Sequence, residues 1–114
     1  MAVSRGFRDF ALEQLGRSAH VTARSMFGGV GVYAEGVFFA LMDDDTLYFK
    51  VDDSNRPDFE ARGMSPFMPY KDPSHVMGYY EVPAEVLEDP DTLRLWVHKA
   101  LAVARSSRKA KRRK

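Results

Sequence analysis

The chain has 114 residues, 17 basic and 16 acidic side chains, and no cysteine. This length suits one domain. Without cysteine there is no disulfide framework, no thiolate nucleophile and no Cys-ligated metal site, which favours a reducing, cytoplasmic location. No segment has the length of a membrane span or the form of a secretory signal. Secretion and membrane insertion are therefore not expected.

The charge is divided unevenly along the chain. Residues 105–114 hold seven basic residues and no acidic one, which leaves residues 1–104 with ten basic against 16 acidic side chains. We therefore expect a domain over residues 1–104 and a basic tail over 105–114. A run of like charges without large apolar residues cannot offset its ordering entropy, so the tail is expected to be frayed or disordered.

The first half of the chain predicts one helix and then three strands. Apolar positions repeat with helical spacing from Phe7 to Leu15, including Phe10, with Ser4 as the cap and Gly16 as the stop. Strands are predicted at 30–34, 37–42 and 46–51, separated by Glu35-Gly36 and by three aspartates at hairpin-length spacing. The second strand is apolar throughout, which is typical of a central strand covered on both sides.

The second half predicts a short helix, two strands and a long helix. Ser54 or Asn55 can cap the short helix, which holds Pro57 and Phe59 and ends near Gly63. Strands follow at 67–70 and 76–82. The long helix runs from about 91 to 105, is capped by Asp91, and has Leu95 on its outer side. The order α-βββ-α-ββ-α indicates an α+β, two-layer sandwich with one antiparallel sheet and helices mainly on one face.

No motif predicts catalysis or a metal site. Gly28-Gly29-Val30-Gly31 resembles a phosphate loop, but a strand pattern follows it instead of a helix, so tight entry into a strand is favoured. His20, His75 and His98 each stand alone in their segments, which favours solvated histidines. A spatially assembled hydrolase site stays open as the last-ranked alternative. Asp43, Asp44 and Asp45 are interpreted as a solvated hairpin tip, because a calcium loop needs alternating acids. We expect no catalytic residues, no metal and no cofactor.

Two segments are candidates for partner contacts. Residues 64–80 are rich in Met and aromatics, and neighbouring strand residues point to opposite faces, so at least one of Tyr79 and Tyr80 is expected at the surface. The candidate interaction patch, for a protein partner or a homodimer, comprises Phe67, Tyr70, Tyr79, Tyr80 and Leu95. The second candidate is non-specific nucleic-acid binding through the tail residues Arg105, Arg108, Lys109, Lys111, Arg112, Arg113 and Lys114. The alternative for the tail is a solubilising role.

An ordered set of short motifs resembles the TfoX (Sxy) N-terminal domain family. The resemblance extends over about residues 5–104, and the first of its motifs is Arg24, Ser25, Met26, Phe27, Gly28 and Gly29. It continues through Gly36-Val37-Phe38-Phe39-Ala40-Leu41, Leu47-Tyr48-Phe49-Lys50-Val51-Asp52, Asn55-Arg56, Phe59, Gly63, Pro66-Phe67, Tyr79-Tyr80-Glu81-Val82-Pro83, Leu87 and Trp96.

The resemblance implies a fold similar to secretion chaperones and a role as a non-enzymatic coactivator of bacterial competence genes. It implies that the protein acts together with a cyclic-AMP receptor protein, and it assigns no catalytic residue to this sequence. The signature residues Arg24, Met26, Phe27, Gly28 and Gly29 are implied to be structural or interacting. The sequence departs from full-length TfoX proteins because the basic tail stands where their second domain follows, so we expect a stand-alone N-terminal-domain protein.

Overall fold

Five strands in the described chain form one open antiparallel sheet whose order follows the sequence, β1-β2-β3-β4-β5. The structure is a computed structural model that describes residues 3–26, 28–67 and 78–112, with side chains as far as residue 107. Along the chain the elements are α1 (Arg5–Gly16), β1 (Val21–Met26), β2 (Gly29–Ala34), β3 (Val37–Asp43), β4 (Thr46–Lys50), α2 (Arg56–Glu60), β5 (Tyr79–Glu81), α3 (Ala84–Leu87) and α4 (Pro90–Arg112).

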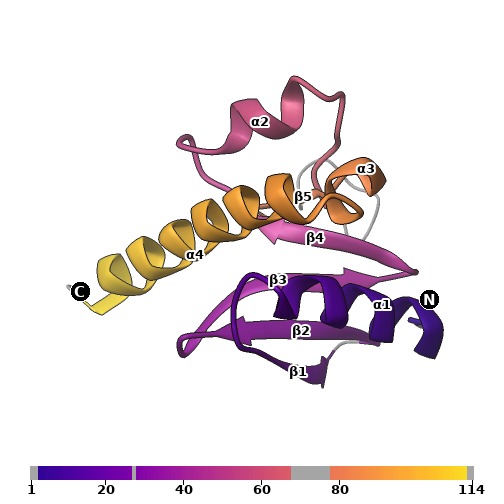
Figure 1. Cartoon of the computed structure of the whole chain (residues 1–114). Coiled ribbons are helices and arrows are strands. Elements are labelled where there is room, and N and C mark those ends of the chain that lie inside the picture. The colour runs from indigo at the N-terminus through magenta and orange to yellow at the C-terminus, as the bar shows by residue number, and fades with distance from the viewer. Residues whose placement is uncertain (1–2, 27, 68–77, 113–114) are drawn as a thin grey trace.

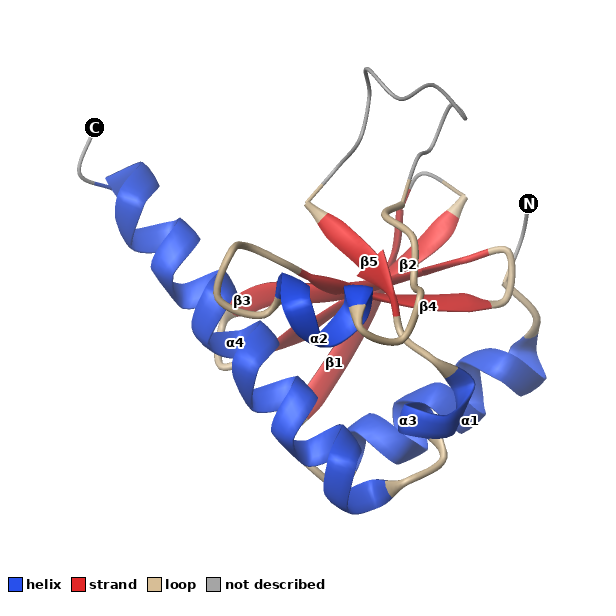
Figure 2. Ribbon diagram, turned by 90° about the horizontal axis from the view of Figure 1, so that it is seen from above, coloured by secondary structure: helices blue, strands red, loops and turns tan. Residues whose placement is uncertain are grey.

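Helices α1, α3 and α4 lie on one side of the sheet, and α2 lies beside β4 and β5 (Figures 1 and 2). The predicted α+β class with a single antiparallel sheet is therefore confirmed. No described helix is both long and apolar enough to cross a lipid bilayer.

The core lies between the sheet and the helices. Phe39 and Phe49 meet there with ring centroids 5.8 Å apart, and α4, whose Leu93 and Val97 are buried, packs on both of their strands. The pairing of β2 with β3 shifts after Val32, so Phe39 is an extra residue in β3. This bulge lets Phe39 and its neighbour Ala40 both be fully buried, which a regular alternation of faces would not allow.

β3 is central, as predicted, but it is covered differently on its two faces. Phe38 and Leu41 point away from the helices and are only half-buried. The apolar run therefore reflects one helix-covered face and a second face that carries its own aromatic residues.

The two hairpins adjoining β3 have the predicted turns. Glu35 and Gly36 have φ values of 54° and 77°, and Asp44 and Asp45 have 51° and 55°. Two consecutive positive φ values match the right-handed twist of a two-residue hairpin.

Asp45 also fixes the start of α1, which the solvated-tip interpretation missed. Its Oδ1 accepts a hydrogen bond of 2.6 Å from the backbone N–H of Ser4, whose Oγ accepts from the N–H of Phe7 at 3.2 Å. Ser4 is therefore the predicted N-cap, held in place by the β3–β4 turn.

Three short elements differ from the prediction. β1 was not predicted, although apolar and polar residues alternate from Val21 to Arg24 as in a strand at the sheet edge with one exposed face. Of the predicted strand at 67–70 only Phe67 is described, and residues 68–77 lie outside the described chain. The N–H of Phe67 donates to the carbonyl of Tyr79 at 2.8 Å, and the preceding Pro66 forms an isolated bridge with Tyr80. α3, which has four residues, is too short for a periodic signal.

Helix α4 differs from the prediction at both ends. It begins at Pro90, and Asp89 caps it instead of Asp91: its carboxylate accepts from the N–H of Asp91 at 3.2 Å and from Thr92 Oγ1 at 2.8 Å. The helix continues to Arg112, so the backbone of the basic segment is helical as far as this residue, where the sequence predicted the helix to end at about 105 and a frayed tail to follow. Ala, Arg and Lys are strong helix formers, and cations stabilise a helix C-terminus.

Two apolar side chains lie outside the core. Leu95 is 65% exposed on the outer side of α4, as predicted. Phe10 was placed in the buried arc of the first helix and is instead 39% exposed, because the buried face of α1 runs through Ala11, Gln14 and Leu15.

Candidate functional site

The glycine motif lies in the β1–β2 hairpin, where it has a packing role. Gly28 has φ of +79°, and a Cβ on Gly29 would fall well inside 3.0 Å of the backbone carbonyl oxygen of Met42 in β3. The two flanking strands are antiparallel and no helix follows, so the phosphate-loop alternative is wrong. The favoured interpretation, tight entry into a crowded strand, is confirmed. Phe27 lies outside the described residues.

Gly31 clears space on the face of the sheet that the helices leave free. A Cβ there would lie 2.9 Å from Met26 Sδ and 3.0 Å from Phe38 Cε1. The absence of a side chain at Gly31 therefore lets Met26 and Phe38 pack closely over β2.

Five rings collect on this second face, which we call the aromatic face and define as Tyr33, Phe38, Tyr48, Phe67 and Tyr79. Ring centroids are 5.1 Å apart for Tyr33 and Phe38, 5.7 Å for Phe38 and Tyr79, and 4.7 Å for Tyr48 and Phe67. Such spacings are typical of favourable tilted ring pairs. No described helix lies on this face (Figure 2), and four of its rings are half-buried while Tyr79 is 5% exposed.

Two cations border the aromatic face. Lys50 Nζ lies 5.0 Å from the centroid of the Tyr79 ring, a cation–π contact. Arg24 pairs with Gly31 across β1 and β2, which puts its exposed side chain on the same face, and no ion pair of Arg24 occurs among the described residues. The surface thus combines rings with positive charge.

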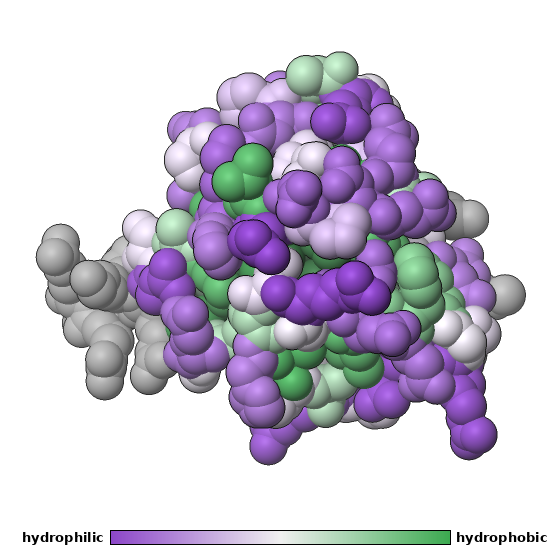
Figure 3. Space-filling view, in the orientation of Figure 1, coloured by the Kyte–Doolittle hydropathy of each residue, from purple (hydrophilic) through white to green (hydrophobic). Residues whose placement is uncertain are grey.

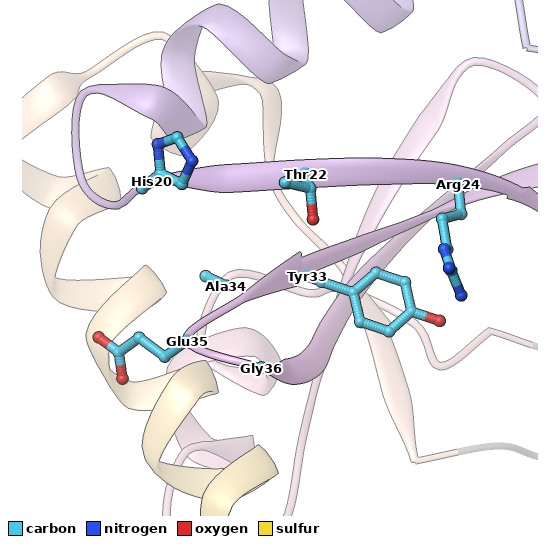
Figure 4. Close-up of a pocket in the computed structure, with 7 residues that line it drawn as sticks. All are labelled: His20, Thr22, Arg24, Tyr33, Ala34, Glu35 and Gly36. Atoms are coloured by element: carbon cyan, nitrogen blue, oxygen red, sulfur yellow. The ribbon is translucent and has the colours of Figure 1, made fainter.

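A shallow, open depression of about 360 Å³ adjoins this face at the β1 edge. Figure 4 shows Arg24 and Tyr33 projecting to the same side, with Glu35 turned away from them. The remaining lining residues are His20, Thr22, Ala34 and Gly36. Glu35 pairs with Arg105 of α4, so this residue serves to fasten the helix to the β2–β3 turn.

Tyr79 gives this face a pH-dependent property. Burial, followed by the charge of Tyr33, raises the pKa of Tyr79 from 10.0 to about 12. Below pH 10 its phenol is neutral in both folded and unfolded chains. Between pH 10 and about 12 the unfolded chain ionises first, so the free energy of unfolding should fall over this window. Urea denaturation at successive pH values should show a smaller fall for Tyr79→Phe; an identical fall would contradict the prediction.

The candidate interaction patch predicted from sequence is not one surface. Phe67 and Tyr79 share the aromatic face, whereas Tyr80 points to the helix side, 5.8 Å from Phe59. Tyr79 is buried and Tyr80 is half-buried, so the expectation that at least one of the two rings reaches the surface holds only in part, for Tyr80. Leu95 lies on the opposite, helix-bearing side, where Figure 3 shows mostly hydrophilic residues with separate small hydrophobic areas. Tyr70 lies outside the described residues.

Sequence reasoning missed Tyr33, Phe38, Tyr48 and Lys50 as members of a surface. One signal was present: the strand alternation at 46–50 puts Tyr48 and Lys50 on the same, wetter face. Burial, followed by the charge of Glu81, raises the pKa of Tyr48, so it stays a neutral hydrogen-bonding ring.

The described histidines fit the simpler of their two interpretations, which is a solvated side chain. His20 and His98 are exposed, and His75 lies outside the described chain. Among the described residues no three His, Cys, Asp or Glu side chains are grouped as metal ligands would be. In the tail, Arg105 is exposed and paired with Glu35; positions 108–112 are described by backbone alone, and Arg113 and Lys114 are not described.

Comparison with known proteins identifies the family. No curated protein matches the chain. The model of the TfoX N-terminal domain matches residues 13–104, which include β1 to β5, the glycine hairpin and the aromatic face. The chain therefore belongs to the TfoX N-terminal domain family.

Proposed function

We propose that the chain is a non-enzymatic, cytoplasmic regulatory module that acts through protein contacts with the transcription machinery. The regulatory context is what the resemblance to the TfoX N-terminal domain family implies, and the family match over residues 13–104 supports that resemblance. The observation that supports a contact role is the aromatic face with Arg24 and Lys50 at its border. Aromatic residues, Met and Arg are enriched where proteins meet, and anchors of this kind dominate binding energy.

The composition of this face also indicates what the partner presents. Tyr48 and Phe67 offer a tilted pair of half-buried rings, and Arg24 offers an exposed guanidinium. An apolar side chain on the partner would cover the rings, and a carboxylate would pair with Arg24. We therefore expect a protein segment with an apolar residue close to Asp or Glu.

Affinity capture from a bacterial lysate with surface variants tests the proposal. Wild type should retain a transcription factor or polymerase subunit, and Arg24→Glu should lower its recovery at least tenfold, because the charge pairing becomes a repulsion. Arg94→Glu makes the same charge change at an exposed position of α4 on the helix side and should leave recovery unchanged. Leu95→Ser tests the outer side of α4 and should also have no effect.

Two results would contradict the proposal. One is capture that recovers no component of transcription. The other is equal loss with Arg24→Glu and Arg94→Glu, which would indicate general charge attraction instead of a contact at the aromatic face.

A further inference from the structure

We propose that the C-terminal part of α4, residues 105–112, is a preformed helical arm that binds the phosphates of duplex nucleic acid; we call it the basic arm. Figures 1 and 2 show that this end of α4 extends past the edge of the sheet. The helical backbone puts positions 105, 108, 109 and 112 within about 100° of one another around the axis, and all four are Arg or Lys. A charge run thereby becomes a one-sided stripe.

The charge density of the basic arm is close to that of a duplex. Five cationic positions lie between 105 and 112, a length of about 10 Å at 1.5 Å per residue. A duplex carries about six phosphates over the same length, at one charge per 1.7 Å. Because Arg105 is paired with Glu35, four cations of the arm remain for these phosphates, about two for every three.

The attached end of the arm is held firmly by the domain. Leu101, Val103 and Ala104 are buried, and Arg105 pairs with Glu35 in the β2–β3 turn. The direction of the arm is thus set by the core, and less conformational entropy is lost when it binds.

The composition of the arm favours a duplex over other anionic partners. Residues 105–114 contain no apolar side chain larger than Ala110, so there is no face to insert into lipid. They contain no aromatic residue on which bases of a single strand could stack. The absence of Asn and Gln predicts binding without sequence preference.

The salt dependence of binding to a 20-base-pair DNA duplex tests the proposal. Six cations follow Arg105, so the slope of log affinity against log salt should be about −5, and affinity should fall about 10³-fold between 50 and 200 mM salt. A chain ending at Ala104 keeps the buried part of α4 and should show no binding. Equal binding by the two chains would overturn the proposal.

A matched pair of variants separates the effect of helix formation on binding from the effect of charge. Ser106→Ala/Ser107→Ala and Ser106→Gly/Ser107→Gly have the same charge, but glycine lowers helix propensity within the arm, directly before its Arg108-Lys109 pair. The alanine pair should bind the duplex about threefold to tenfold more tightly, with circular dichroism reporting its higher helix content. Equal affinities with different helix contents would overturn the preformed arm.

The partner class is tested with vesicles of phosphatidylcholine and phosphatidylserine at the same salt. Binding to the vesicles without binding to DNA would overturn the nucleic-acid assignment. The result is distinguishable from the contact at the aromatic face, because Arg24→Glu should leave most duplex binding intact and the chain ending at Ala104 should still capture its protein partner.

Discussion

Replacing Gly29 by alanine should lower the free energy of unfolding by about 3 kcal/mol, since overpacking of a rigid site costs roughly this much. The new Cβ would meet the backbone carbonyl oxygen of Met42, which is fixed by strand pairing and cannot rotate away. Either the β2–β3 hairpin separates at this point or the β1–β2 turn shifts. Urea denaturation monitored by Trp96 fluorescence should show a lower midpoint with a similar slope.

Two other glycines provide controls for the same chemical change. A Cβ on Gly6, in α1, meets nothing within 4 Å, so Gly6→Ala should stabilise the chain by about 0.5–1 kcal/mol through helix propensity. Gly28→Ala has space but a positive φ, and should cost about 1–2 kcal/mol. A Gly29→Ala variant no less stable than Gly28→Ala would contradict the close-approach argument.

Periodic segments could be predicted from the sequence, because their burial pattern repeats within one element. In α4, Leu93, Val97 and Leu101 recur at the spacing of one helix face and lie in the core, and Leu95 lies outside it, as predicted. The cap of α4 could not be chosen correctly, since Asp89 and Asp91 both precede the apolar stripe. The prediction for residues after Arg105 weighed repulsion among like charges more heavily than helix propensity. In the structure these residues follow a helical turn that is packed in the core, and the helix continues through them.

The aromatic face could not be assembled from the sequence, because its members meet only through strand register. Tyr79 lies beside Lys50 because β5 pairs with β4, and Phe38 reaches Tyr79 only because a bulge in β3 sets which face Phe38 takes. Sequence-local clustering instead joined Tyr79 to Tyr80 and Leu95, which lie on the other side of the sheet. A ring-rich segment therefore predicts that a surface exists, whereas the register decides which rings form it.

Asn55 should be the most sensitive polar position in the chain. This residue is 1% exposed. Asn55 occupies the N-cap position of α2, one of the two caps that the sequence offered, but its side chain makes no capping hydrogen bond. Its Nδ2 donates to the carbonyl of Lys50 at 3.1 Å and its Oδ1 accepts from the N–H of Asp52 at 2.9 Å. Its amide thus satisfies two backbone groups where the chain leaves β4 for α2.

Asn55→Ala should lower the free energy of unfolding by about 3 kcal/mol, because each orphaned, poorly hydrated backbone group costs roughly 1–3 kcal/mol. Ser54→Ala is the neighbouring control: it removes an exposed hydroxyl bonded to Asp52 and should cost less than about 1 kcal/mol. Asn55→Asp keeps the acceptor and loses the donor, so its deficit should shrink as acid protonates the carboxyl and restores a donor to the Lys50 carbonyl. Thermal unfolding of the three variants at two pH values decides the matter: a pH-independent deficit in Asn55→Asp would show that the donor to Lys50 contributes little.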